Sequence, residues 1–282
     1  MSPRPSHPAP RTSQPAPRTP HLAPRSFVVT IGTGTVVPSG ERGSPSYWFE
    51  HGDVRLLMDC GAGTIHRLAR FGLPWPELTH VAITHYHNDH IGELPALVYA
   101  MLYGQLPPRS APLMLFGPEG MKEKVARLAA AHGDWLAKPD FPMEVVELRP
   151  GVEYLLTPPL APRTSHLSVC RTPHTDESLA FSLTTPDGRL VYTGDTGPSD
   201  ALGDWARGCD LLVAECSLPD DMALDIHLTP RQAGALAARA GAKRLVLTHL
   251  YPPVEAVDIA AQVAEAYRGD VVIARDGQRF EV

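Results

Sequence analysis

Residues 84–90 read Thr-His-Tyr-His-Asn-Asp-His, which places four metal-ligand side chains within six positions: His85, His87, Asp89 and His90. Packing rarely requires three imidazoles and a carboxylate so close together, whereas a divalent metal does. Zinc binds histidine nitrogen and carboxylate oxygen, and catalytic zinc sites keep one position open for water beside three protein ligands. An exposed polar loop with incidental histidines is the alternative. We interpret the segment as part of a metalloenzyme site that suits two adjacent metals.

The flanking sequence places this cluster on a loop between a strand and a helix. Residues 78–84 contain the apolar run Val81-Ala82-Ile83, which predicts a buried strand. Residues 91–103 predict a helix, since Pro95 would fall in its first turn, where proline is tolerated. On such a loop the side chains of His85 and His87 can project to the same side.

Four further polar residues occupy the end of an apolar strand. They are His174, Asp195, Glu215 and His249, which follow or end the predicted strands 167–172, 190–193, 210–215 and 244–248. Strands that end in histidine or aspartate can converge on one rim of a sheet sandwich. The sequence therefore predicts that distant positions share one metal site.

The remaining pattern predicts two runs of strands, each joined to helices, and thus an α/β fold of two packed sheets with helices outside. Further strands are expected at 26–31, 46–50, 54–59, 113–116, 145–148 and 179–184, with 271–274 and 278–282 as a closing hairpin. Helices are expected from Gly63 to about 72, and at 91–103, 120–132, 230–240 and 254–267.

The first 25 residues differ in composition from residues 26–282. They hold eight of the 30 prolines and four arginines, and they contain no acidic residue. Such a segment buries too little apolar surface to offset its ordering entropy, so we expect residues 1–25 to form a disordered tail and residues 26–282 to form one domain. A basic docking arm is the functional alternative for the tail.

The charge balance argues against a long nucleic acid as partner. The chain carries 25 basic and 31 acidic residues, and without the four arginines of the tail 21 basic residues face 31 acidic ones, a net charge of −10. Polyanion binding depends on clustered lysine and arginine, and no such run occurs here.

The cysteines and the apolar runs bear on location. The four cysteines form no Cys-x-x-Cys pair and no disulfide-like framework, which favours a reduced, cytoplasmic setting. The sequence has no apolar run typical of a secretory signal or of a transmembrane helix, so we expect no membrane association.

Along the chain the ligand-type residues read His-x-His-x-Asp-His, then His, then Gly-Asp-Thr, then Thr-His. This order resembles the metallo-β-lactamase superfamily, and the flanking motifs resemble its ribonuclease Z branch. The motifs are Ile31-Gly-Thr-Gly-Thr-Val-Val-Pro38 with Arg42, Met58-Asp-Cys-Gly-Ala-Gly-Thr64, Phe116-Gly-Pro118, Gly194-Asp-Thr196 and Leu247-Thr-His249. The resemblance covers residues 26–282 and implies an αββα sandwich of two mixed β-sheets with helices on the outer faces.

The resemblance also implies seven metal ligands, all present in type. One metal would be held by His85, His87 and His174, and the other by Asp89, His90 and His249, with Asp195 bridging the two. The implied catalytic residues are Asp89, Asp195, Glu215 and His227, in which Glu215 positions His227 as a proton donor. A surface histidine before a helix is the alternative for His227. Two zinc ions per protomer are the expected cofactors, and manganese or iron would also suit these ligands.

Two departures from the ribonuclease Z pattern affect the expected substrate. A histidine precedes the glutamate in that branch, whereas Ala214 precedes Glu215 here. Enzymes of the branch that process transfer-RNA precursors carry a long protruding arm, whereas His174 and Asp195 lie only 21 positions apart. A small phosphodiester, such as a cyclic nucleotide, is therefore the expected substrate.

We accordingly expect a binuclear metal-dependent phosphodiesterase that acts on a small anionic substrate, with a hydroxide between the metals as the nucleophile. A ribonuclease Z-type RNA 3′-end endonuclease is one alternative, and a lactonase or thioesterase on the same metal site is another. A metal-stabilised binding protein without activity fits least, because the ligand set is complete. A homodimer is implied by the resemblance alone.

Overall fold

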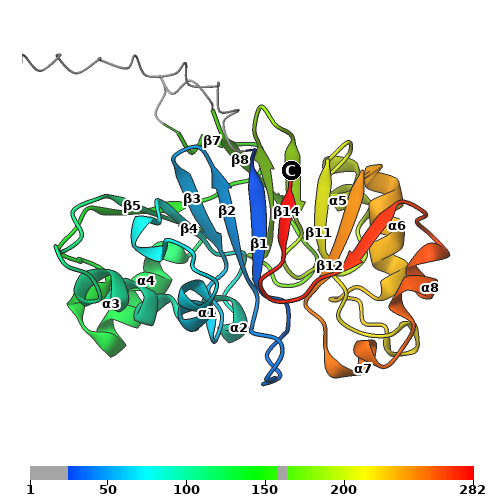
Figure 1. Cartoon of the computed structure of the whole chain (residues 1–282), viewed down its shortest axis with the longest axis horizontal. Helices are drawn as coiled ribbons and strands as arrows, with labels where there is room; N and C mark the ends of the chain where they lie inside the picture. Colours follow the sequence, from blue (N-terminus) through cyan, green and yellow to red (C-terminus); the bar gives the residue numbers. More distant parts are fainter. Residues whose placement is uncertain (1–24, 158–163) are drawn as a thin grey trace, which may run out of the picture.

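The computed structural model describes residues 25–157 and 164–282, and within these ranges fourteen strands form two seven-stranded sheets (Figure 1). The first sheet has the order β14-β1-β2-β3-β4-β5-β6, and the second has the order β13-β12-β11-β10-β9-β8-β7. Each sheet is mixed. Strands β14 to β3 are antiparallel and β3 to β6 parallel, while β7 to β10 are antiparallel and β10 to β13 parallel.

The strands of the first sheet are β1 (Phe27–Gly32), β2 (Ser46–His51), β3 (Val54–Met58), β4 (His80–Ala82), β5 (Leu113–Gly117), β6 (Met143–Glu147) and β14 (Arg279–Glu281). Those of the second sheet are β7 (Glu153–Leu155), β8 (His166–Arg171), β9 (Leu179–Thr184), β10 (Arg189–Tyr192), β11 (Leu211–Glu215), β12 (Arg244–Thr248) and β13 (Asp270–Ile273).

The helices flank the strands on two opposite sides, as Figure 1 shows. Beside the first sheet are α1 (Thr64–Arg70), α2 (Asn88–Ile91), α3 (Leu94–Tyr103) and α4 (Met121–His132). Beside the second are α5 (Asp200–Trp205), α6 (Pro230–Ala240), α7 (Pro252–Glu255) and α8 (Ile259–Ala264). Short 3-10 turns are η1 (Trp75–Glu77), η2 (Asp134–Leu136) and η3 (Asp220–Met222).

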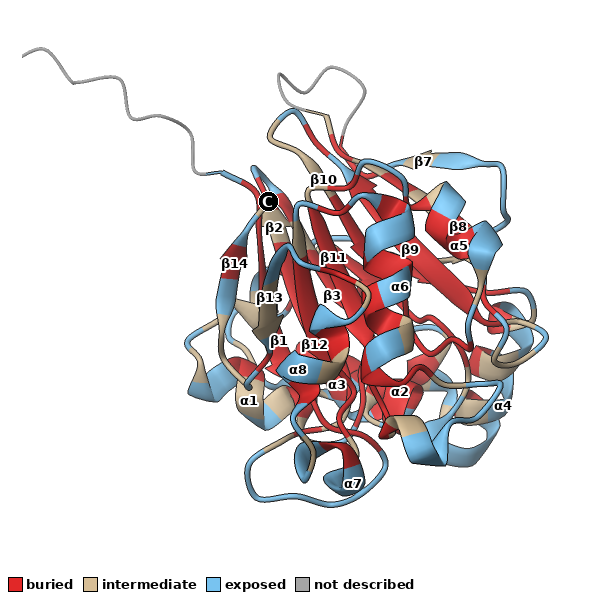
Figure 2. Ribbon diagram, turned by 90° about the vertical axis from the view of Figure 1, so that its right-hand side faces the viewer, coloured by how far each residue is buried: buried red, intermediate tan, exposed pale blue. Residues whose placement is uncertain are grey.

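Strand periodicity explains why the sheets pack as two inner layers. Tyr47 and Phe49 of β2 lie in the core between the sheets, whereas Trp48 lies in the core beneath the helices of the first sheet. In β11, Val213 faces the core between the sheets and Leu212 the helix side. Because successive side chains of a strand point to opposite faces, each sheet buries apolar residues on both sides. Figure 2 shows central strands such as β9 and β11 as buried and the outer side of α6 as exposed.

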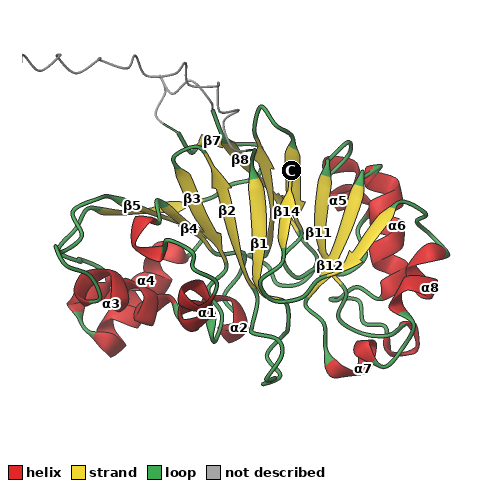
Figure 3. Ribbon diagram, in the orientation of Figure 1, coloured by secondary structure: helices red, strands yellow, loops and turns green. Residues whose placement is uncertain are grey.

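This architecture confirms the predicted sandwich of two mixed sheets with outer helices, but the predicted closing hairpin is wrong. Strand β13 pairs in parallel with β12, whereas β14 pairs with β1 of the other sheet (Figure 3). The prediction of a single helix at 254–267 is also wrong, because two helices lie there. The segment is divided into α7 and α8 because Asp258 caps a new helix by accepting from the Ala261 N–H.

Other predicted elements are confirmed with shifted bounds. The predicted helix at 91–103 is divided into α2 and α3, and Pro95 lies in the first turn of α3 as expected. The strands 46–50 and 54–59 form the expected antiparallel pair. The predicted tail lies outside the described residues except for Arg25, so its disorder stays a prediction. None of the described helices is long and apolar enough to cross a membrane.

Candidate metal centre

The predicted ligands meet at one end of the two sheets. His85 and His87 lie on the loop between β4 and α2, and His249 follows β12 directly. Strands β10, β11 and β12 are parallel neighbours, so their carboxyl ends lie on one edge and bring Asp195 close to Glu215 and His249. Helices α2 and α7, which begin just after these loops, lie at the lower end of both sheets in Figure 1.

Four of the predicted ligands form a first group. The donor atoms of His85, His87, His174 and Asp195 all lie within 4.8 Å of one another. His85 Nε2 and His174 Nε2 lie 3.0 and 3.1 Å from His87 Nδ1, and 3.8 and 3.6 Å from Asp195 Oδ2. His85 and Asp195 are buried, while His87 is exposed. This group can therefore take an ion from solvent on the side of His87.

The other predicted ligands form a second group. Asp89, His90 and His249 are all buried, and their donor atoms also lie within 4.8 Å of one another. His249 Nε2 lies 3.6 Å from Asp89 Oδ2 and 3.4 Å from Asp195 Oδ2. His90 Nε2 lies 3.3 Å from Asp195 Oδ1. The Asp195 carboxylate therefore faces both groups, one oxygen being near His90 and the other near His85, His174 and His249.

The separations of Asp195 from His90 and from His249 fit a metal ion better than a hydrogen bond. Donor atoms placed about 2.0 to 2.1 Å from one tetrahedral zinc ion lie about 3.3 to 3.4 Å apart. The distances from Asp195 to His90 and to His249, 3.3 and 3.4 Å, equal such a tetrahedral edge. In addition, three buried atoms of the predicted ligands have no hydrogen-bond partner among the described residues: His90 Nε2, His249 Nε2 and Asp195 Oδ1. Buried polar atoms are normally paired, so an ion between them would satisfy all three.

The far nitrogen of each buried histidine is held by the protein. His174 Nδ1 lies 2.9 Å from the Ile226 carbonyl, which can only accept, so this nitrogen donates. His249 Nδ1 lies 2.8 Å from the Ser217 hydroxyl. His90 Nδ1 lies 2.8 Å from Asp59 Oδ2. Such partners fix the tautomer and orientation of a metal-binding imidazole and leave its Nε2 directed at the ion.

Asp59 is a site residue to which the sequence assigned no role, although it lies in the Met58–Thr64 motif. Its side chain is fully buried and accepts from the Thr84 N–H at 2.8 Å as well as from His90. Its backbone φ of 59° is uncommon for a residue other than glycine, as is the φ of 56° at His249. Such positive φ values cluster at functional sites. The signal available was an acidic residue at the end of a buried strand, the pattern that indicated Asp195.

His227 and Glu215 lie together beside the metal ligands. His227 Nδ1 is 3.1 Å from each carboxylate oxygen of Glu215. Glu215 is itself buried and accepts from the Thr196 and Leu228 N–H groups at 2.5 and 3.2 Å. The ring of His227 lies 4.8 Å from that of His174 and 5.6 Å from that of His249. These contacts contradict the surface-histidine interpretation of His227, and a ring nitrogen of His227 also lies within 4.8 Å of ligand atoms of Asp195 and His249.

Burial and neighbouring charges set the protonation of the site. Burial, together with the charge of His90, holds the pKa of His85 well below its usual range, and burial lowers the pKa of His174. Burial alone would raise the pKa of Asp195, but the charges of His249 and His90 outweigh it and hold that pKa low. Asp89 follows the same pattern, because His249 and His90 lower its pKa against burial. Neutral imidazoles and ionised carboxylates are the forms that bind metals.

The pKa values of His90 and His227 are both raised against the effect of burial. Burial would lower the pKa of His90, but the charges of Asp195 and Asp59 raise it. Burial would also lower the pKa of His227, and the hydrogen bond and charge of Glu215 raise it above the usual value. The raised pKa favours the protonated form of His227, which is the form that a proton donor requires.

Tyr251 is a second residue that the sequence did not indicate. It caps the start of α7, and its ring lies 5.6 Å from that of His249 and 6.2 Å from that of His227. Burial and the charges of Asp89 and Asp195 raise its pKa to about 12, so the phenol stays protonated and can act as a donor.

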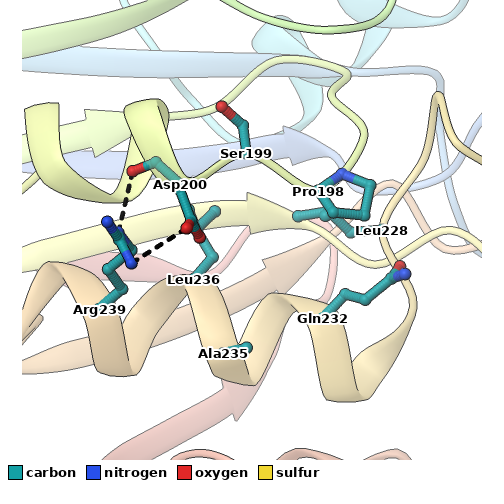
Figure 4. A pocket seen from close by; sticks show the side chains of 8 residues that line it. All are labelled: Pro198, Ser199, Asp200, Leu228, Gln232, Ala235, Leu236 and Arg239. Atoms are coloured by element: carbon teal, nitrogen blue, oxygen red, sulfur yellow. Dashed lines mark hydrogen bonds and ion pairs between the residues drawn. The ribbon is translucent and has the colours of Figure 1, made fainter.

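A groove of about 280 Å³ lies between α5 and α6 (Figure 4). Its lining residues are Pro198, Ser199, Asp200, Leu228, Gln232, Ala235, Leu236 and Arg239. The guanidinium of Arg239 is already bound to Asp200, with 3.2 Å between Arg239 Nη1 and Asp200 Oδ2. The groove contains none of the predicted ligands, so we do not place the reaction there.

Comparison with known proteins agrees with this geometry. A Beta-lactamase superfamily domain matches residues 54–250. A Ribonuclease Z from Mycobacterium bovis (strain BCG / Pasteur 1173P2) is 31% identical, and the match covers 90% of this chain and 98% of the relative. A Ribonuclease Z from Haloferax volcanii is 29% identical, with 89% and 93% covered.

Two solved structures share the fold. The metallo-beta-lactamase fold protein YhfI from Bacillus subtilis has a TM-score of 0.76 and 26% identity, and the match covers 92% of this chain and 100% of that chain. Human tRNase Z, short form, has a TM-score of 0.70 and 25% identity, with 90% and 98% covered. The family match, the two mixed sheets and the cluster of histidines and aspartates establish that the chain belongs to the metallo-β-lactamase superfamily of hydrolases.

Proposed function

We propose that the protein is a binuclear metal-dependent phosphodiesterase that acts on a small anionic phosphodiester. The observation that carries this proposal is the carboxylate of Asp195, which lies between two groups of ligand-type side chains and whose distances to His90 and His249 match the edges of metal coordination. In this proposal His85, His87 and His174 hold one metal, Asp89, His90 and His249 hold the other, and Asp195 bridges them.

The two metals, when bound, would supply Lewis acidity and lower the pKa of water toward about 7. The protein's own residues contribute orientation and a proton. His227 presents Nε2 to the substrate while Glu215 holds Nδ1, so the ring can give its proton to a departing oxygen. Ser217 lies 3.4 Å from His227 Nδ1 and 2.8 Å from His249 Nδ1, and so couples the proton donor to a metal ligand.

The pair of Glu215 and His227 favours reaction at phosphorus over reaction at carbon. A phosphodiester with a poor alkoxide leaving group needs a proton at that oxygen, and a positioned imidazole provides it. A lactonase or thioesterase on the same metals would not require a dedicated donor. Two metals about 3.5 to 4 Å apart are a recurring arrangement for in-line displacement at phosphorus. The choice of zinc, with manganese or iron as the alternatives, belongs to this proposal.

A ribonuclease Z-type endonuclease is the second candidate, since relatives at 29 to 31% identity carry that name. The missing arm is a weak argument against it, because the match already covers 98% of the Mycobacterium relative. The stronger argument is charge. The net charge outside the tail is −10, so few basic side chains can neutralise RNA phosphates, and the counterion release that drives binding of a long RNA would be small.

Turnover by the metal-loaded protein separates these candidates. We expect bis-p-nitrophenyl phosphate and at least one cyclic mononucleotide or dinucleotide to be cleaved, and p-nitrophenyl esters to be poor substrates. Cleavage of a transfer-RNA precursor alone, with steep loss of rate as salt is raised, would assign the ribonuclease Z function instead. Ester turnover without phosphodiester turnover would assign carbon chemistry. A homodimer in a cytoplasmic setting is part of the same proposal, and size-exclusion chromatography with light scattering tests the dimer.

A further inference from the structure

Two buried tyrosines meet in the core between the sheets, directly beneath the metal centre. Tyr47 comes from β2 of the first sheet and Tyr192 from β10 of the second, and their ring centroids lie 4.4 Å apart. Both side chains are almost completely buried, at 0% and 2% exposure. A phenylalanine would fill such a space equally well, so the two hydroxyl groups require a separate explanation.

The hydroxyl of Tyr192 reaches one ligand of the second group through Asp59. It donates to Asp59 Oδ2 at 2.7 Å, and the same oxygen accepts from His90 Nδ1 at 2.8 Å. The other oxygen, Oδ1, accepts from the Thr84 N–H. Tyr192 therefore fixes the oxygen that orients the imidazole of His90.

The hydroxyl of Tyr47 reaches another ligand of the same group from the opposite side. It lies 2.7 Å from the Thr248 hydroxyl, and Thr248 directly precedes His249. The backbone of His249 has a φ of 56°, a conformation that the surrounding contacts must hold in place. The rings of Tyr47 and Tyr192 pack against each other, so the two contacts lie side by side in the core.

We propose that Tyr47 and Tyr192 are positioning residues for the second metal, the one assigned to Asp89, His90 and His249. The shortest described paths from the pair lead through Asp59 to His90 and through Thr248 to His249, whereas His85 is reached only through both Asp59 and Thr84. The pair also joins the two sheets, which contribute these ligands separately. The inference rests on the proposed binuclear site. It adds that the position of the second metal depends on the tyrosine pair in the core between the sheets more than the position of the first metal does.

Cobalt titration of the chelated full-length protein tests the proposal, because the d–d absorption of cobalt reports each binding step. The wild type should take up two ions. Tyr192→Phe should weaken one step by about 10-fold or more, the size of effect that partners of a ligand produce, and leave the other step unchanged. The weakened step should be the one that His249→Ala removes, and Tyr47→Phe should weaken the same step.

A matched control is Tyr267→Phe, which removes a buried hydroxyl that donates to the Ala242 carbonyl at 2.8 Å in the core beneath the helices of the second sheet. It should lower stability to a similar degree in chemical unfolding of the metal-free protein and leave both cobalt steps unchanged.

If Tyr192→Phe weakened both steps equally, or neither, the tyrosine pair would be structural only. If the wild type took up fewer than two ions, the binuclear site itself would be wrong. Should Tyr192→Phe fail to fold, Thr248→Val removes the partner of Tyr47 and is expected to weaken the same step.

Discussion

Replacing His227 with alanine should slow the release of poor leaving groups far more than that of good ones. His227 is placed to protonate the departing oxygen, since Glu215 holds its Nδ1 at 3.1 Å and raises its pKa against burial. A nitrophenolate departs readily as an anion, so it gains little from that proton. A ribose 3′-alkoxide gains much.

The structure limits the size of the effect. General-acid assistance contributes about 10² to 10⁴-fold in rate. The side chain of His227 is 11% exposed, so water can partly replace the lost donor. We therefore expect a loss at the lower end, about 10² to 10³-fold or about 2.7 to 4 kcal/mol of activation free energy, for the alkoxide substrate. For bis-p-nitrophenyl phosphate the loss should stay within a few-fold.

The assay compares kcat for both substrates in wild type, His227→Ala and the control His132→Ala, whose side chain is exposed at the end of α4. Metal content should be unchanged in every variant, because His227 is not among the seven proposed ligands. An equal loss on both substrates with metal retained would mean that His227 binds substrate. No loss on either would refute the proton-donor role and favour carbon chemistry.

Three further predictions follow from the same geometry. Asp195→Ala should abolish hydrolysis and lower metal content below two equivalents, since its carboxylate faces both ligand groups; retained activity would refute the bridge. Removal of residues 1–25 should leave turnover and unfolding unchanged, because the proposed metal ligands and proton donor all lie between 85 and 249, and a large loss would assign the tail a role in substrate capture. Burial lowers the pKa of His80 to about 4 from 6.5. The folded state then binds fewer protons than the unfolded state between those values, so stability is lost as pH falls from 6.5 toward 4. In urea unfolding, the free energy of unfolding of the wild type should fall between pH 7 and pH 5. His80→Phe should make this fall smaller by about 2 kcal/mol, and a fall of unchanged size would contradict the burial argument.

The sequence predicted the parts of the fold that depend on local pattern. Short apolar runs marked strands such as β2 and β11, and the histidine and aspartate positions at strand ends marked the predicted ligands. The seven ligand positions were found because each is a distinctive residue type next to an apolar run. Their division into two groups with Asp195 between them came from the resemblance and stays a proposal.

The sequence could not predict which strands pair across the molecule. Residues 271–274 and 278–282 are separated by a short turn with Gly277 at a φ of 84°, and locally they fit a hairpin. Their actual partners are 26 or more positions away along the chain, β12 for one and β1 for the other. The short elements β7 and α5 were missed because three or six residues carry too little periodicity. Asp59 was missed because its role depends on the approach of His90 and Tyr192 in space.

Metal analysis of the freshly purified protein tests the central claim most directly. Two groups of ligands that share Asp195 predict a content that approaches two equivalents per protomer, with proportional loss of phosphodiesterase activity as the metal is chelated. A reproducible content of one equivalent with full activity would contradict the binuclear mechanism.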